Sequence, residues 1–119
     1  MRKVKVGIVQ QQISNDVQEN MNLLKKNIEQ CSVPGAELVV LQELHNTPYF
    51  CQTENPTNFD LAERIPGPST DFYSQIAKEQ KIVLVTSLFE KRAEGLYHNT
   101  AVVFDFDGTL SARDSNVEF

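Results

Sequence analysis

The sequence contains no tryptophan, only two cysteines and no long uninterrupted apolar segment. A membrane-spanning helix needs about 18 or more consecutive apolar residues, so the chain is not expected to enter a membrane. Its start is basic, but the short apolar segment that follows stops in glutamines instead of forming the core of a signal peptide. We therefore expect a cytoplasmic protein.

Basic residues are also scarce. Eleven lysines and arginines stand against 16 aspartates and glutamates, and the formal net charge is -5. Apart from the short start "MRKVK", lysine and arginine do not cluster. A basic patch is what binds the phosphate backbone, so nucleic acid is not an expected partner.

The two cysteines, Cys31 and Cys51, have no neighbouring residues at metal-ligand spacing. Neither a zinc site nor a disulfide framework is indicated, and we expect no metal and no cofactor. Cys31 falls at the end of a predicted helix, where a small buried apolar residue is the ordinary role of cysteine.

Alternating types of segment organise the chain, which at 119 residues is one domain at most. Apolar runs predict strands, and apolar spacings of three and four predict helices. The predicted order is β-α-β-α-β-β-β, with strands over 3–10, 36–44, 82–91 and 96–106, a fifth strand beginning at 109, and helices over 14–31 and 69–81.

Both helices show starting signals and an apolar stripe. The first can be capped by Asn15 or Asp16 and the second by Ser69 or Thr70. The residues expected to face the core are Val17, Met21, Leu24 and Ile28 in the first helix and Phe72, Ile76 and Ala77 in the second.

This order predicts an α/β sheet whose helices cover one face. Residues 38–41 and 82–85 are apolar at every position, as in central strands. The opposite face of the sheet is therefore expected to be apolar and to need a cover that this chain does not supply.

The stretch "FDFDGTL" permits two interpretations. Asp105 and Asp107 resemble the DxDGT nucleophile motif of the haloacid-dehalogenase-type phosphatases, which need magnesium, a lysine and further carboxylates from later strands. The 12 residues after Asp107 contain no lysine. Alternatively, Asp107-Gly108 is the turn of a hairpin between two strands, and we favour this interpretation.

Glu43 is the more informative acid. It follows an apolar run, at the carboxyl end of a predicted central strand, where open α/β sheets place their ligand crevices. A carboxylate there can act as a base. The alternative is that Glu43 only meets solvent or a lysine at the strand end.

Several segments together resemble the nitrilase, or carbon–nitrogen hydrolase, superfamily. They are "KVKVGIVQ", "GAELVVLQEL", "RIPGPSTDFYSQIAKEQKIVLVTSLFEK" and "LYHNTAVVFDFDGTL". The resemblance covers 3–110 and implies an α/β fold, the N-terminal portion of a four-layer α-β-β-α sandwich that assembles into homo-oligomers. Residues 111–119 diverge, so we expect 1–119 to be a partial carbon–nitrogen hydrolase domain.

The resemblance implies a Glu–Lys–Cys mechanism, with Glu43 as the general base. The family lysine lies in a segment like K-Y-R-K-x-H, where this chain has "SARDSNVEF", and the nucleophilic cysteine lies on a later strand. Cys51 is not expected to replace it. The chain by itself is therefore expected to be inactive, and an alternative role is a non-catalytic fragment that only associates with full-length subunits.

The segment "LQELHNTPYFCQ" resembles the N-carbamoylputrescine amidases in particular. That resemblance implies a small N-carbamoyl amine as substrate and a role in putrescine synthesis. Tyr49 and Phe50 are candidate substrate-binding residues because they can line a pocket for an aliphatic chain. His45 is expected to be a solvated loop residue, although it follows the base and can touch a ligand.

Overall fold

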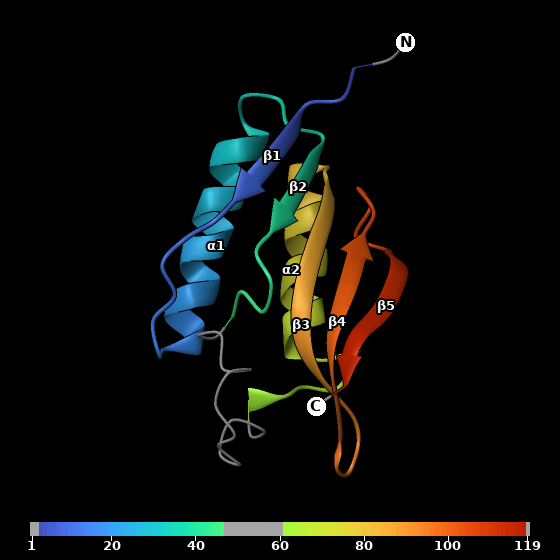
Figure 1. Cartoon of the computed structure of the whole chain (residues 1–119). Coiled ribbons are helices and arrows are strands. Elements are labelled where there is room, and N and C mark those ends of the chain that lie inside the picture. Colours follow the sequence, from blue (N-terminus) through green and yellow to red (C-terminus); the bar gives the residue numbers. More distant parts are fainter. Residues whose placement is uncertain (1–2, 47–60, 119) are drawn as a thin grey trace.

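The computed structural model describes residues 3–46 and 61–118, with side chains up to position 114. Figure 1 shows five strands and two helices in the predicted order. The strands are β1 (Val6–Val9), β2 (Leu38–Leu41), β3 (Val83–Ala93), β4 (Leu96–Phe104) and β5 (Leu110–Glu118), and the helices are α1 (Val17–Ser32) and α2 (Pro68–Gln80).

The strands form one sheet in the order β1-β2-β3-β4-β5. The pairs β1–β2 and β2–β3 are parallel, with α1 and α2 as their connections, and β3–β4 and β4–β5 are antiparallel. This confirms the α/β class and the interior position of the strands predicted over 38–41 and 82–85. The carboxyl ends of the parallel strands consequently meet at one edge.

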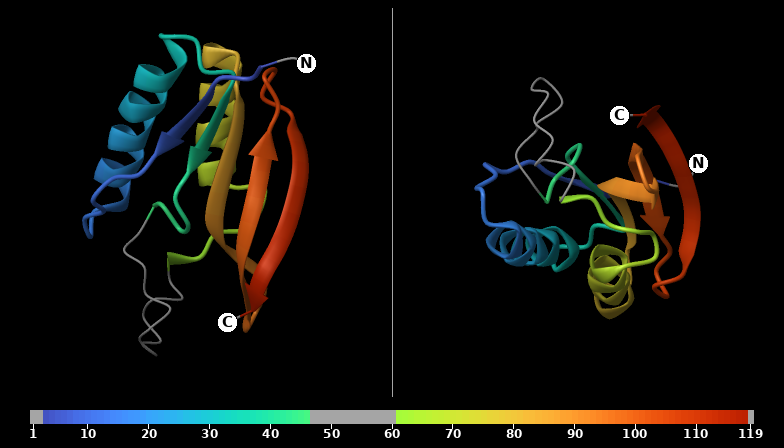
Figure 2. Two further views of the ribbon diagram at one scale, coloured as in Figure 1. Left: turned by 45° about the horizontal axis from the view of Figure 1, so that its top comes forward. Right: turned by 90° about the horizontal axis from the view of Figure 1, so that it is seen from below.

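Both helices lie on the same face of the sheet, which is clearest in the end-on view of Figure 2. From α1, Met21, Leu24 and Ile28 are buried as predicted, and Val17 packs at the margin of the core. From α2, Ile76 and Ala77 are buried while Phe72 is only partly buried. Neither described helix is long and apolar enough to cross a bilayer.

The helix starts resolve the capping alternatives. Asp16 caps α1, because its carboxylate accepts a hydrogen bond of 3.0 Å from the backbone N–H of Glu19. The prediction of Ser69 or Thr70 as the cap of α2 is wrong, since the cap is Gly67 and Pro68 follows as the first helical residue. The Thr70 hydroxyl instead reaches back and accepts from the N–H of Gly67 at 2.6 Å.

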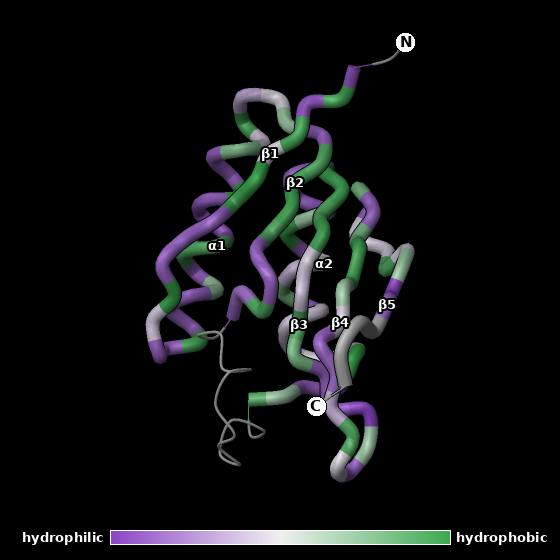
Figure 3. Tube along the Cα trace, in the orientation of Figure 1, coloured by the Kyte–Doolittle hydropathy of each residue, from purple (hydrophilic) through white to green (hydrophobic). Residues whose placement is uncertain are grey.

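The face of the sheet away from the helices, here called the helix-free face, is apolar. Figure 3 shows that apolar residues predominate along β2 and the first part of β3, and that β1 contains apolar residues as well. Side chains alternate along a strand, and Val9 and Val39 point into the core beneath the helices. Val6 and Ile8 therefore point the other way and are 49% and 76% exposed. Nothing in the described residues covers them.

The Asp-Gly stretch is the hairpin that joins β4 to the antiparallel β5. The backbone N–H of Asp105 donates to Thr109 O at 2.7 Å, and Gly108 N–H donates to Asp105 O at 2.9 Å. Gly108 has a φ of 88°, which a glycine adopts without steric cost. Asp107 accepts from the N–H of Thr109, and this hydrogen bond lowers the pKa of its carboxyl. The hairpin interpretation is confirmed.

Candidate functional site

Three polar side chains from three strands meet where the parallel strands end. Glu43 follows β2, Ser87 lies in β3, and Asn99 lies near the start of the antiparallel β4. Leu88 points into the core, so its neighbour Ser87 points to the helix-free face. The exposed Glu43 carboxylate joins Ser87 and Asn99 at this edge.

Hydrogen bonds link these side chains in series. The backbone N–H of Leu44 donates to Ser87 Oγ at 3.0 Å, and the Ser87 hydroxyl donates to Asn99 Oδ1 at 2.8 Å. Asn99 Nδ2 then donates to Glu43 Oε1. Asn99 is only 2% exposed, whereas Glu43 is open to the helix-free face. The arrangement holds one carboxylate oxygen and leaves the other accessible.

The chain turns sharply immediately after Glu43. Leu44 has a φ of 48°, a left-handed conformation that is unfavourable for a side chain with a Cβ. Its side chain is 2% exposed and its N–H is bonded to Ser87, so packing and hydrogen bonding hold the turn. The Glu43 side chain is thus placed by a constrained backbone.

His45 contradicts its prediction, because it is completely buried instead of solvated. Its ring packs edge-on against Tyr73 of α2, with ring centroids 5.0 Å apart, and its Nδ1 lies 2.8 Å from Asn46 Oδ1. Tyr73 donates to the same oxygen at 2.6 Å, while Asn46 Nδ2 donates to Ser69 Oγ at 2.9 Å. His45 therefore connects the segment after Glu43 to α2 through its contact with Tyr73.

Burial lowers the pKa of His45 to about 4 from an ordinary value of 6.5, against a weaker opposing effect of its hydrogen bond to Asn46. Between these values the unfolded chain binds a proton that the folded chain does not, so stability falls as the pH falls. We expect the free energy of unfolding to decrease by about 2 kcal/mol between pH 7 and pH 5 from this group alone.

The measurement is urea unfolding at both pH values for the wild type and for His45→Gln, which stays neutral throughout. The pH dependence of the variant should be smaller by that amount, because the carboxylates titrate in both proteins. Equal pH dependence in the two proteins would contradict the buried, neutral state of His45.

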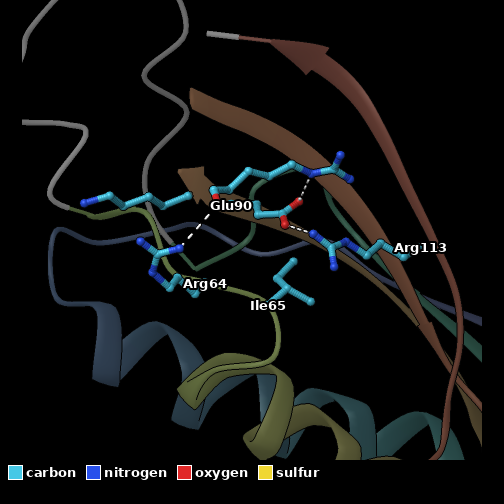
Figure 4. A pocket seen from close by; sticks show the side chains of 6 residues that line it. Arg64, Ile65, Glu90 and Arg113 are labelled. Carbon is cyan, nitrogen blue, oxygen red and sulfur yellow. Dashed lines mark hydrogen bonds and ion pairs between the residues drawn. The ribbon is translucent and has the colours of Figure 1, made fainter. Parts of the chain in front are cut away.

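A second polar cluster lies on the opposite, helix-covered side of the sheet (Figure 4). Glu90 is 1% exposed and accepts hydrogen bonds from Thr100 at 2.7 Å, from Arg92 at 3.3 Å and from Arg113. Glu90, Arg92 and Arg113 line an open pocket of about 420 Å³ together with Arg64, Ile65 and Lys91. Glu43 is not among its lining residues, so this pocket is separate from the site of the predicted base.

The remaining predicted site residues are distributed as follows. Tyr49, Phe50 and Cys51 lie outside the described residues. Cys31 is on α1 and packs against the core close to Gly7, but it is only partly buried and not fully buried as predicted. Among the described residues, no group of three histidine, cysteine or acidic side chains could hold a metal ion. Because Cys31 lies on α1 beneath the sheet, no thiol in the described part of the chain faces Glu43.

A sheet of this order, with both connecting helices on one face and a carboxylate at the carboxyl edge, defines the α/β class predicted from the sequence. The family model for carbon–nitrogen hydrolases matches residues 5–118. The chain belongs to that family, and its fold is that of the N-terminal portion of nitrilase-superfamily proteins.

Individual relatives support this assignment. A crystal structure of a carbon–nitrogen hydrolase from Helicobacter pylori G27 superposes with a TM-score of 0.88 at 40% identity, over 94% of this chain and 39% of that one. The omega-amidase NIT2-B of Xenopus laevis is 34% identical over 98% of this chain and 41% of its own length. A citrullinase of Francisella tularensis is 33% identical over 92% of this chain and 38% of its own. The chain thus spans about two fifths of these relatives.

Sequence reasoning missed the partners of Glu43. Asn99 lies in the "YHNT" stretch, which contributes a predicted strand and part of the family resemblance but no predicted site residue, and Ser87 is not among the predicted site residues either. A signal was present, because a buried strand that carries an asparagine must provide that amide with hydrogen-bond partners. Asn99 lies near the start of the antiparallel β4, which is level with the carboxyl ends of the parallel strands, so its partners are expected among the residues at those ends.

Proposed function

We propose that this chain carries the general base, Glu43, of an enzyme that hydrolyses a carbon–nitrogen bond in a small amide or carbamoyl compound. The observation that supports this most is the exposed Glu43 carboxylate, held by Asn99 at the carboxyl edge of the sheet. On this proposal residues 1–119 form part of a carbon–nitrogen hydrolase domain, and the complete enzyme is a homo-oligomer.

In the proposed reaction Glu43 takes the proton of a cysteine thiol, because only the thiolate is strongly nucleophilic. The thiolate attacks the carbonyl or ureido carbon, and a lysine stabilises the oxyanion that develops. The amine or ammonia leaves, and water hydrolyses the thioester that remains. The catalytic lysine and cysteine are supplied by polypeptide outside these 119 residues.

We propose N-carbamoylputrescine as the substrate, with Tyr49 and Phe50 contacting its aliphatic chain. Among the relatives, the name of the citrullinase specifies a substrate with a ureido group, which is the group that N-carbamoylputrescine carries. The products would be putrescine, carbon dioxide and ammonia. The name omega-amidase instead specifies a terminal amide, so this class is the competing substrate.

The test is a hybrid enzyme in which residues 1–110 of this chain are followed by the remainder of the Helicobacter pylori hydrolase. Ammonia release is measured with N-carbamoylputrescine, citrulline and an aliphatic ω-amide, beside the unaltered Helicobacter enzyme as control. We expect the hybrid to be active and to favour N-carbamoylputrescine more than the control does. A folded hybrid that hydrolyses none of the three would overturn the proposal.

The chain of 119 residues by itself should release no ammonia from these compounds. Its described cysteine, Cys31, lies beneath the sheet on α1, whereas Glu43 opens to the helix-free face. The measurement is a coupled ammonia assay at high protein concentration. Release that is abolished by Glu43→Gln would show that these residues already contain a complete site.

A second candidate function is a non-catalytic role in which the chain associates with full-length subunits. The exposed apolar side chains of Val6 and Ile8 favour it, because a large apolar patch promotes association. Mixing the chain with an active hybrid distinguishes the two candidates. A chain that associates with the hybrid without changing the rate of ammonia release would support the second candidate.

A further inference from the structure

We propose that Asn99 is a positioning residue for Glu43 and that Ser87 sets the orientation in which it works. The proposal rests on the proposed function of Glu43 and deepens it. In this arrangement Glu43 Oε1 accepts the hydrogen bond from Asn99, and Oε2 is the oxygen that takes the proton of the thiol.

The first step fixes the Ser87 hydroxyl. A hydroxyl group has one proton to donate. Ser87 Oγ accepts from the backbone N–H of Leu44 at 3.0 Å, and that N–H can only donate. The Ser87 proton therefore remains for its other partner, Asn99, 2.8 Å away.

The second step fixes the Asn99 amide. Because Ser87 donates, the atom facing it is the acceptor Oδ1, and Nδ2 is turned toward Glu43 Oε1. The side chain is 2% exposed, so water does not compete for either end. An amide flip would place the Oδ1 lone pairs against the acceptor-only carboxylate and lose the hydrogen bond to Glu43, whereas Ser87 Oγ could still accept from Nδ2 with its second lone pair.

The two oxygens of the Glu43 carboxylate differ in their surroundings. Oε1 accepts from Asn99, and within the described residues Oε2 has no hydrogen-bond partner, while the side chain is exposed on the helix-free face. A general base must keep one lone pair aimed at the proton that it accepts. Holding Oε1 removes the rotation that would misdirect Oε2, and the neutral donor does so without a competing charge.

The experiment uses the 119-residue chain and nuclear magnetic resonance, so it does not depend on hydrolysis. The Asn99 side-chain amide protons should titrate with the same midpoint as the Glu43 carboxyl carbon, and Glu43→Gln should abolish that titration. Asn27 is the matched control, since its Nδ2 donates at 2.7 Å to the neutral Gln11 side chain and should not respond. The proposal would be overturned if the Asn99 amide proton shifts changed neither with pH nor on Glu43→Gln substitution.

Ser87→Ala keeps the strand intact and tests the orienting step. In the chain it should weaken the response of Asn99 to Glu43. In the hybrid enzyme it should lower kcat about tenfold, the effect of roughly one lost hydrogen bond, and leave KM unchanged. Unchanged kcat would contradict the inference, while an inactive parent hybrid would refute the proposed function and leave the resonance test to decide on Asn99.

Discussion

Replacing Glu43 with glutamine in the hybrid enzyme should leave a folded protein whose kcat is lower by about 10²–10⁴-fold, the usual contribution of a general base. Glutamine has the same length as glutamate, and its carbonyl oxygen can still accept the Asn99 hydrogen bond. The missing property is basicity, so the nucleophilic thiol would keep its proton. The measurement is steady-state ammonia release together with circular dichroism.

The matched variant is Cys51→Ala in the same hybrid, which should remain active because that thiol is not the proposed nucleophile. Retained activity in the Glu43→Gln hybrid would refute the assignment of the base. A folded but inactive Cys51→Ala hybrid would mean that the nucleophile is Cys51, and the proposed supply of the thiol from outside this chain would then be wrong.

Glu90→Ala should destabilise the isolated chain by about 4 kcal/mol, since it removes the shared acceptor of a buried ionic cluster and the hydrogen bonds that this carboxylate accepts. The Glu90 carboxylate is 1% exposed and accepts from Thr100, Arg92 and Arg113. The side chains of Arg92 and Arg113 are 41% and 32% exposed, so partial rehydration keeps the effect below the upper limit for buried clusters. The total stability of a domain is only about 5–15 kcal/mol.

Urea unfolding followed by circular dichroism measures this effect. Glu90→Gln should cost less, because the amide retains an acceptor for Thr100. Glu94→Ala is the matched control: it removes an exposed ion pair of 2.9 Å with Lys91 in the same hairpin and should change stability far less than Glu90→Ala does. An unfolding midpoint for Glu90→Ala equal to that of Glu94→Ala would show that the cluster is not stabilising.

The layout of the fold could be predicted from the sequence because its signals are local. The spacing of Met21, Leu24 and Ile28 fixes the buried side of α1, and Asp107-Gly108 marks a hairpin. The strands predicted over 38–41 and 82–85 are central because they are apolar on both faces. The cap of α2 was mistaken because two hydroxyl residues follow Gly67-Pro68, and the proline at the first helical position was the stronger signal.

The site was less accessible to sequence reasoning, because its contacts join distant residues. Glu43 was found from its place at a strand end, but Asn99 is 56 positions away and its role depends on the register of β3 with β4. The burial of His45 likewise depends on Tyr73, a residue of α2 that was not among those expected to face the core. Tyr49 and Phe50, which lie outside the described residues, remain predictions.

The division of the sheet into a parallel and an antiparallel half has a consequence for the order of folding. Strands β3, β4 and β5 follow one another through short turns, so closing these hairpins costs little chain entropy, whereas β1 and β2 pair only across whole helices. The amide of Asn99 belongs to the early half and the carboxylate of Glu43 to the late one. We therefore expect the contact between them to form only when β2 docks on β3, so that the site is assembled after the hairpins have closed.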